Sequence, residues 1–367
     1  MPAIPASSEA YQTLARSVLK NNLKVRPGDR VIVEGWTHTL PASVAFAREV
    51  RRMKAQPLLT YEDETAYWDS VDRKEDKVLG TPAAHEFAAL GKTNVYIHMW
   101  GPGDRIRLGN LPDARQEKLF GFNTDWYKTA RKAKLRGARL EIGRPYPSLA
   151  KVYEADEATW RSQLMAATMV PPARLKAAGV PIERALRKGR QLRIHDDQGT
   201  DLTLGLAHYA PRANYGEITP EALKSPFGML LNLPAGAIRV ALDEKVAEGT
   251  IRANRSSYYE TGKTTGGVFQ FRDGRLTEAT FATGGDLFDR GYADGGKGRD
   301  LPGFLSIGLN PELHNTPQVE DLEAGAVLVS LGGNAQLGGK TKGPFFGFVV
   351  NAGAKVEVDG RPVPLPG

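Results

Sequence analysis

The feature that most constrains this fold is a regular alternation of strand-like and helix-like segments in the first half of the chain. Segments typical of strands are VIVEG (31–35), PLLTYED (57–63), NVYIHMW (94–100) and ARLEIG (138–143). Amphipathic segments typical of helices precede and separate them, at 8–22, 40–55, 81–91 and 124–137. This alternation predicts a parallel sheet with helices on both faces, which is a three-layer α/β domain. No GxGxxG motif follows the first strand, so the sequence gives no support for a dinucleotide site.

The second half of the chain has a different texture. QLRIHDDQGTDLTLGL (191–206) predicts a β-hairpin with DDQG at its turn. After it glycines multiply and β-type runs dominate, including MLLNLPAG (229–236), AVLVSLG (326–332) and AKVEVDG (354–360). A chain of 367 residues is too long for one ordinary core. We therefore expect an N-terminal α/β domain at residues 1–190 and a mixed, sheet-rich C-terminal domain at residues 191–367.

Composition excludes several classes of function. The chain has no cysteine, which excludes disulfides, thiolate metal sites and cysteine nucleophiles. No apolar run approaches the roughly 18 residues of a membrane span. The first residues lack the pattern of a secretion signal, so we expect no membrane association and a cytoplasmic protein.

Positive charge is concentrated in one part of the chain. The net charge is +7, and the stretch from Arg105 to Arg193 holds 20 Lys and Arg against 8 Asp and Glu. Such a stretch can attract nucleic acid or anionic substrates. The solvent-exposed faces of helices such as KTARKAKLRGARL account equally well for this excess of Lys and Arg. No nucleic-acid-binding motif accompanies them. We therefore do not expect a nucleic-acid partner.

Five segments follow one another in an order that matches a known family. They are PGDRVIVEG (27–35), RPYPSLAKVYEADEATWRSQLMAAT (144–168), NLPAGAIRVALDEKVAEGTI (232–251), GFLSIGLNPEL (303–313) and AGAVLVSLGGNAQLGGK (324–340). In this order the chain resembles the thermophilic aminopeptidase family of metallopeptidases (aminopeptidase T and S, often labelled leucyl aminopeptidase). The resemblance implies a two-domain fold of that type. It also implies a homodimer, because the catalytic domain of that family usually pairs around a cavity.

The resemblance also implies where metal ligands would lie. Two metal ions in that family activate water and hold the substrate, which requires oxygen and nitrogen ligands. Carried over position by position, the ligands fall on Ala237, Phe304, Leu328, Phe346 and Phe348. A relative of the same fold, 2,5-dihydroxypyridine dioxygenase, implies one iron at the positions of Phe304, Phe346 and Phe348. None of these side chains coordinates a hard cation, so we expect no metal and no cofactor.

Two polar segments offer other chemistry. RSSYYETGKTTGG (255–267) is dense in hydroxyls and cations, and Arg252 and Arg255 could bind a carboxylate through a bidentate guanidinium. In GGKTKG (338–343), a desolvated Lys340 or Lys342 could act as a base or nucleophile. The simpler interpretation of 255–267 is a polar strand with its turn. The simpler interpretation of 338–343 is an exposed glycine-lysine turn.

Two histidines and a run of aspartates complete the candidates. His314 follows the GLNPEL segment closely, and His208 follows TDLTLGL. Both are equally compatible with ordinary surface positions. The segment GGDLFDRGYADGGKGRD (284–300) is interpreted as an acidic loop. Its aspartates could supply a general base or be simply hydrated: Asp286, Asp289, Asp294 and Asp300.

These observations predict a metal-independent enzyme of hydrolase or ring-opening type. Its substrate would be a small anionic, aromatic or amide-bearing metabolite. The predicted catalytic residues are Lys340, Lys342 and His314. The predicted substrate-binding residues are Arg252, Arg255, Tyr258, His208, Phe304, Phe346 and Phe348. Two alternatives stay open: a metal-dependent aminopeptidase with relocated ligands such as His208 and His314, and a non-catalytic dimer that binds a small ligand.

Overall fold

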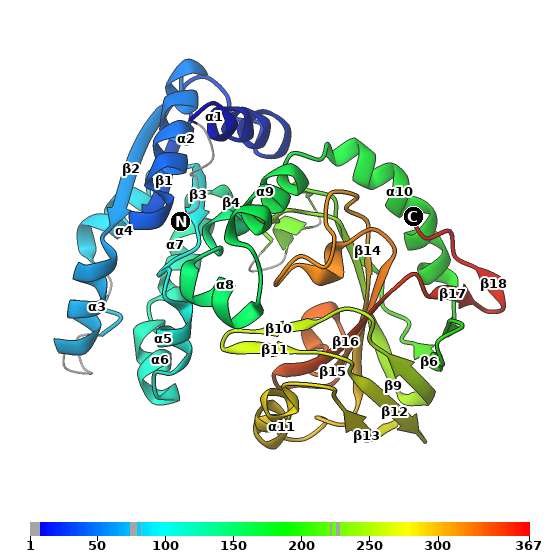
Figure 1. The fold of residues 1–367 in the computed structure, drawn as a ribbon. Coiled ribbons are helices and arrows are strands. Elements are labelled where there is room, and N and C mark those ends of the chain that lie inside the picture. The colour runs from blue at the N-terminus through cyan, green and yellow to red at the C-terminus, as the bar shows by residue number, and fades with distance from the viewer. Residues whose placement is uncertain (1–7, 74–78, 82, 221, 225–227) are drawn as a thin grey trace. The chain divides into compact units, whose positions relative to one another are not determined.

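The chain forms two compact units, each built from two stretches of sequence (Figure 1). The computed structural model describes residues 8–73, 79–81, 83–220, 222–224 and 228–367. The first unit extends to Met169 and also includes Gly216–Pro234, whereas the second comprises Val170–Tyr215 and Ala235–Gly367. The boundary expected at residue 190 separates domains that would fold independently. The two compact units do not test that expectation.

The first unit contains a five-stranded sheet in which every neighbouring pair is parallel. The strands lie in the order β2 (Gln56–Glu62), β1 (Arg30–Trp36), β3 (Val95–Met99), β4 (Arg136–Leu140) and β8 (Leu230–Leu233). The four strands expected from the N-terminal sequence are confirmed. The run 229–236 was grouped with the sheet-rich second half, and this was wrong. The chain returns to the first unit at Gly216, and β8 pairs in parallel with β4. This pairing buries Leu231 and Leu233.

Helices cover both faces of this sheet, as the alternating pattern predicted. On one face α2 (Leu40–Arg52) brings Ser43 Oγ to 3.4 Å from Met99 Sδ. On the other face Trp126 of α7 (Asn123–Lys132) packs edge-on against Tyr96, with 5.0 Å between ring centroids. The remaining helices of the unit are α1 (Ser8–Ser17), α3 (Glu64–Arg73), α4 (Ala84–Leu90), α5 (Arg105–Gly109), α6 (Asp113–Leu119), α8 (Pro147–Tyr153) and α9 (Glu157–Thr168).

One row of the parallel sheet is polar across all five strands. The register places Thr60, Glu34, His98, Arg139 and Asn232 side by side. Strands of a parallel sheet are ordinarily apolar on both faces, so these residues need partners. Glu34 Oε1 lies 3.0 Å from His98 Nδ1. Burial pushes the pKa of Glu34 upward. The charge of His98 and the hydrogen bonds that Glu34 accepts from His98 and Tyr96 hold this pKa below its usual value.

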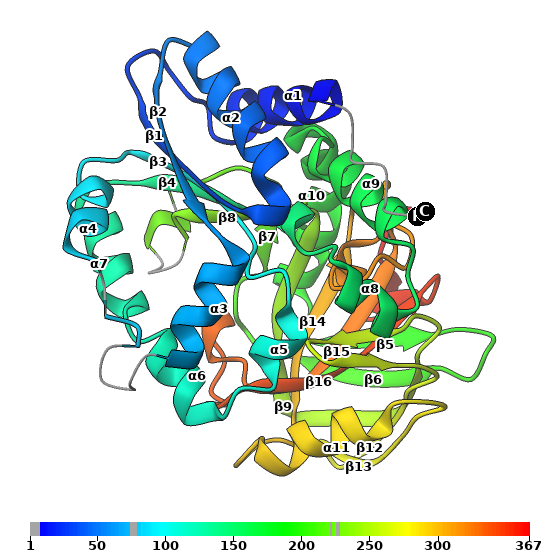
Figure 2. The same ribbon diagram turned by 60° about the vertical axis from the view of Figure 1, so that its left-hand side comes forward.

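The second unit is built around an antiparallel sheet of eleven strands (Figure 2). At its centre is β9 (Ala237–Arg252), a strand of 16 residues. The predicted hairpin is confirmed, since β5 (Gln191–His195) and β6 (Asp201–Leu206) are antiparallel neighbours. The other strands are β7 (Arg212–Asn214), β12 (Val268–Arg272), β13 (Arg275–Thr280), β14 (Pro302–Gly308), β15 (Ala326–Gly332), β16 (Phe345–Ala352), β17 (Lys355–Val358) and β18 (Arg361–Pro362). The predicted mixed, sheet-rich character of this half is therefore confirmed.

The acidic segment that was expected to be a loop is in part a helix. Residues Gly285–Asp294 form α11. Phe288 and Tyr292, one turn apart, pack with 5.8 Å between ring centroids, and Phe288 also contacts Phe281 at 5.1 Å. This apolar stripe holds the helix on the sheet despite its glycines, because burial outweighs weak helix propensity. The unit also contains α10 (Pro172–Lys188) and a small hairpin of β10 (Ser257–Tyr259) and β11 (Gly262–Thr264).

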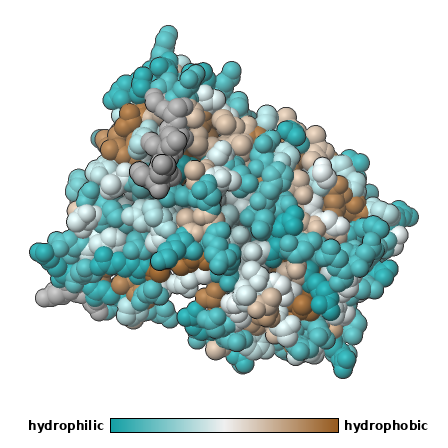
Figure 3. All heavy atoms as spheres, in the orientation of Figure 1, coloured by the Kyte–Doolittle hydropathy of each residue, from teal (hydrophilic) through white to brown (hydrophobic). Residues whose placement is uncertain are grey.

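Hydrophilic residues cover most of the face drawn in Figure 3, and hydrophobic residues appear there in separate patches. Among the described residues, no helix is both long enough and apolar enough to cross a membrane.

Candidate functional site

Four neighbouring strands of the second unit bring the predicted ligand positions to one face of the sheet. Paired residues of antiparallel strands project to the same side. Phe304 pairs with Ala241, Ser306 pairs with both Arg239 and Leu328, and Ser330 pairs with Phe348. Ala237 lies on the same side, opposite Gly308. The alternation of strands β9, β14, β15 and β16 therefore places Ala237, Phe304, Leu328 and Phe348 on a common surface, here called the apolar face.

The centre of the apolar face is closely packed. Phe304 and Leu328 are each only 5% exposed and belong to one cluster with Ala326 and Val350, against which Phe348 packs. The Phe304 N–H donates to Ser330 Oγ at 2.9 Å, which ties β14 to β15. Three of the five positions that the resemblance assigned to metal ligands thus touch the same apolar cluster. The side chain of Phe346 lies outside the described part of the structure.

An arginine, an aspartate and a serine border the apolar face. Arg239 Nη2 donates to Asp321 Oδ2 at 2.6 Å, and Ser306 Oγ donates to the same oxygen at 2.9 Å. The Arg239 guanidinium also lies over the Phe304 ring, 6.0 Å from its centroid, at the outer range of a cation–π contact. Arg239 is 43% exposed along its side chain, whereas Asp321 is 14% exposed. The carboxylate is therefore largely buried and fixes the position of the arginine, whereas the guanidinium retains access to solvent.

A second aromatic side chain extends the apolar face. Tyr259 stacks on Phe348 with 5.6 Å between centroids and 25° between the ring planes. Burial, and then the charge of Glu320, raises the pKa of Tyr259. Glu320 is 4% exposed, and its Oε1 accepts a hydrogen bond from the Tyr258 N–H at 3.1 Å. The hydroxyl of Tyr259 therefore stays protonated at neutral pH and can act as a hydrogen-bond donor.

The predicted binding residues Arg255 and Tyr258 lie together with His314, around Glu323. Arg255 donates to both oxygens of Glu323, at 2.7 and 3.0 Å. Burial pushes the pKa of Glu323 upward, but Arg255 and the Asn315 N–H lower it further than burial raises it. Tyr258 is buried, and its hydroxyl donates to Asn315 O at 3.5 Å. His314 is exposed and close enough for its charge to lower the pKa of Glu323.

The other predicted residues lie on exposed segments. Lys340 and Lys342 are exposed on the connection between β15 and β16, where the Lys340 N–H donates to Glu244 Oε1 at 3.1 Å. His208 is exposed after β6. Arg252 lies over the hairpin turn, with its Nε 2.9 Å from the place that a Cβ of Gly199 would occupy. Neither lysine has the burial that would desolvate its ammonium group.

Sequence reasoning missed Arg239, Ser306, Asp321 and Tyr259 as members of one site. Arg239 is the only charged residue in AIRVAL (237–242), an otherwise apolar strand, and that signal was available. Asp321 lies 82 residues further along the chain, and no spacing rule connects it to Arg239.

The residues at the implied metal positions do not fit a metal ion. Alanine, leucine and phenylalanine side chains offer no lone pair, and an apolar surface makes a divalent charge costly. Across the described residues, no three His, Asp or Glu side chains come together as a ligand set.

Comparison with known proteins places this chain in a family. Residues 7–293 match the model of the thermophilic metalloprotease (M29) family. The chain belongs to the M29 family. This confirms the resemblance drawn from the five sequence segments. The M29 match ends before Phe304, Leu328 and Phe348, so this part of the apolar face lies outside the matched residues.

Two solved structures share the fold of this M29 member. Wild-type AmpT from Thermus thermophilus is similar at a TM-score of 0.67 and 17% identity, with 96% of each chain covered. The 2,5-dihydroxypyridine dioxygenase from Pseudomonas putida KT2440 is similar at a TM-score of 0.61 and 16% identity, covering 99% of this chain and 97% of that one. No curated protein sequence matches the chain. At these identities the two structures establish the fold alone.

Proposed function

We propose that this M29 member works without a bound metal, as a hydrolase or ring-opening enzyme acting on a small anionic, aromatic or amide-bearing metabolite. The observation that supports the proposal is the contact of Phe304, Leu328 and Phe348 in one apolar cluster. A two-metal mechanism needs charged and imidazole ligands at such positions. An apolar face suits an aromatic ring instead, since burying apolar surface contributes roughly 25 cal/mol per Å².

Arg239 is the side chain best placed to orient an anionic group beside this face. Asp321 holds its guanidinium in position from one side, while 43% of the side chain stays exposed. Arg255 is less suitable, because both oxygens of the buried Glu323 engage its fork and only 28% of its side chain is exposed. Arg239 also donates through Nε and Nη2, but to a single oxygen of Asp321. We therefore assign carboxylate binding to Arg239 and ring stacking to Phe348 and Tyr259. Lys340, Lys342 and His314 remain the proposed catalytic residues.

A second candidate function is ligand binding without turnover. The observation that favours it is that Lys340, Lys342 and His314 are all exposed. An exposed amine or imidazole lacks the desolvation that makes a strong buried base or nucleophile. Under both candidate functions we propose a cytoplasmic homodimer, as the resemblance implied. A solution mass equal to one chain would contradict the dimer.

Hippurate is a suitable first probe, since it carries a carboxylate, a phenyl ring and an amide. Calorimetry would measure its binding to protein treated with a chelator, and chromatography would detect benzoate and glycine formed by addition of water. We expect saturable binding that the chelator does not change. Formation of the two products distinguishes an enzyme from a binding protein.

Matched variants test the assigned residue. Arg239→Gln should weaken hippurate binding about tenfold or more, the effect of losing a charged hydrogen bond. Arg193→Gln, which removes another arginine paired with an aspartate in the same unit, should leave binding unchanged. Cleavage of a leucine anilide that requires added zinc, cobalt or manganese would contradict the proposal and support the aminopeptidase alternative.

A further inference from the structure

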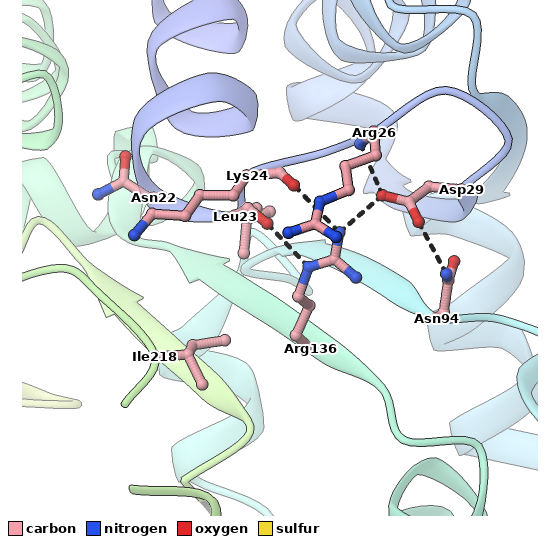
Figure 4. A pocket seen from close by; sticks show the side chains of 8 residues that line it. All are labelled: Asn22, Leu23, Lys24, Arg26, Asp29, Asn94, Arg136 and Ile218. Carbon is pink, nitrogen blue, oxygen red and sulfur yellow. Dashed lines mark hydrogen bonds and ion pairs between the residues drawn. The ribbon is translucent and has the colours of Figure 1, made fainter. Parts of the chain in front are cut away.

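The first unit carries a basic pocket that none of the preceding chemistry uses. It lies where β1, β3 and β4 begin, and has a volume of about 450 Å³. All of its lining residues belong to this unit (Figure 4). They are Asn22, Leu23, Lys24, Arg26, Asp29, Asn94, Arg136 and Ile218.

The backbone around the pocket is tightly specified. Arg26, Pro27, Gly28 and Asp29 form a tight turn, closed by a hydrogen bond of 3.1 Å from the Asp29 N–H to Arg26 O. Gly28 has a φ of 84°, which a type II turn requires at its third residue. Lys24 has a φ of 50°, an uncommon conformation for a residue with a side chain. Arg26 and Asp29 are thereby held at the two ends of one rigid turn.

Asp29 fixes Arg136 from inside the pocket. Arg136 Nη2 donates to Asp29 Oδ2 at 2.6 Å, and its Nε donates to Leu23 O at 2.8 Å. Asn94 Nδ2 donates to the other oxygen, Asp29 Oδ1, at 2.8 Å. Burial pushes the pKa of Asp29 upward, but the hydrogen bonds from the Arg26 N–H and from Arg136 hold it below its usual value. The Arg136 guanidinium is therefore locked before any ligand arrives.

Positive charge exceeds negative charge in this pocket. Asp29 neutralises Arg136, and Glu217 pairs with Lys24 at 2.9 Å. The Arg26 side chain has no hydrogen bond or ion pair with any residue that the structure describes. In Figure 4 the Arg26 and Arg136 guanidinium groups point toward one another, while Lys24 extends toward Asn22. Because Asp29 pairs with Arg136 alone, the converging guanidinium groups keep one positive charge that a bound anion can balance.

We propose that this pocket binds the phosphate group of a small metabolite, with Arg26 and Arg136 as its principal donors. The Arg26 fork can bind two phosphate oxygens in a bidentate manner. Arg136 uses its Nε and Nη2 for Leu23, Lys24 and Asp29, so its Nη1 is the group that can donate to a further oxygen. Lys24 adds a point charge at the rim. The site is independent of the apolar face, because all of its residues lie in the first unit.

The test uses the full chain and inorganic phosphate as the probe, with binding measured by calorimetry. We expect saturable binding at concentrations up to about 10 mM, a range that reveals a Kd near 1 mM. Arg26→Gln should weaken it about tenfold or more, since the variant removes charged hydrogen bonds. Arg48→Gln, an exposed arginine on α2 outside the pocket, should leave it unchanged.

Two further arms make the result decisive. Arg136→Lys keeps the charge but loses the guanidinium that Asp29 and Leu23 hold in place, so it should bind phosphate more weakly than the unaltered chain. A single-stranded oligonucleotide tests phosphodiesters, and its binding without any binding of inorganic phosphate would overturn the proposal. Equal phosphate affinity in the Arg26→Gln and Arg48→Gln variants, or no saturable phosphate binding, would overturn it as well.

Discussion

Asp321 accepts hydrogen bonds from both Arg239 and Ser306 at the border of the apolar face. Ser306 is fully buried and Asp321 nearly so, while Arg239 reaches solvent. The carboxylate therefore does two things at once. It satisfies a buried hydroxyl, and it fixes the direction of the cation that we assign to ligand binding.

Asp321→Asn should lower the free energy of unfolding by about 1–2 kcal/mol. Breaking a fully buried pair costs about 3–5 kcal/mol, and the exposure of Arg239 reduces this. Urea denaturation at neutral pH would measure the change. The matched control is Asp286→Asn on α11, whose pair with Arg290 is exposed on both sides and should contribute within about 0.5 kcal/mol. Equal effects of the two substitutions would contradict the role given to Asp321.

Glu323 makes stability depend on pH in a defined direction. Its folded-state pKa is lowered, so its contribution is fully present above its unfolded pKa, near 4.5. The contribution is lost as pH falls through the folded value. In Glu323→Gln the free energy of unfolding should fall less between pH 6 and acid conditions, measured by urea denaturation across pH. Glu278→Gln, an exposed residue, should keep the full pH dependence; an identical pH profile for both variants would refute the assignment.

At the scale of elements, strands were easier to predict than helices in the second unit. The hairpin of β5 and β6 followed from two apolar runs around DDQG. Helix α11 was missed because Gly285, Gly291 and several aspartates favour a loop, whereas tertiary contacts of Phe288 decide its structure. Local propensity is a weak guide when one buried aromatic side chain anchors a short helix.

Phe288→Ala should therefore destabilise the chain by about 3–5 kcal/mol, the usual cost of removing a buried phenylalanine ring. Phe288 is 3% exposed and contacts Phe269, Phe281 and Tyr292. Asp289→Ala changes the neighbouring exposed residue and should stay within about 0.5 kcal/mol. Chemical denaturation of both variants would measure the difference, and a small effect of Phe288→Ala would mean that α11 does not depend on this contact.

At the scale of the molecule, the sequence could predict the fold class and family but only part of the candidate site. The family resemblance led to Phe304, Leu328 and Phe348, and the strand register brings them together. The partnership of Arg239 with Asp321, and of Arg255 with Glu323, depends on contacts between distant segments. Periodicity within one segment carries no information about such pairs. For the same reason the sequence placed the run that forms β8 with the C-terminal strands that follow it, although this strand pairs with β4.

This M29 member has an apolar face where the resemblance implies a pair of metal ions. Elemental analysis of chelator-free protein, after incubation with zinc, cobalt or manganese and removal of the excess, tests it most directly. We expect essentially no bound metal per chain. A stoichiometry of about one or two ions per chain, as a working metal site would need, would contradict it.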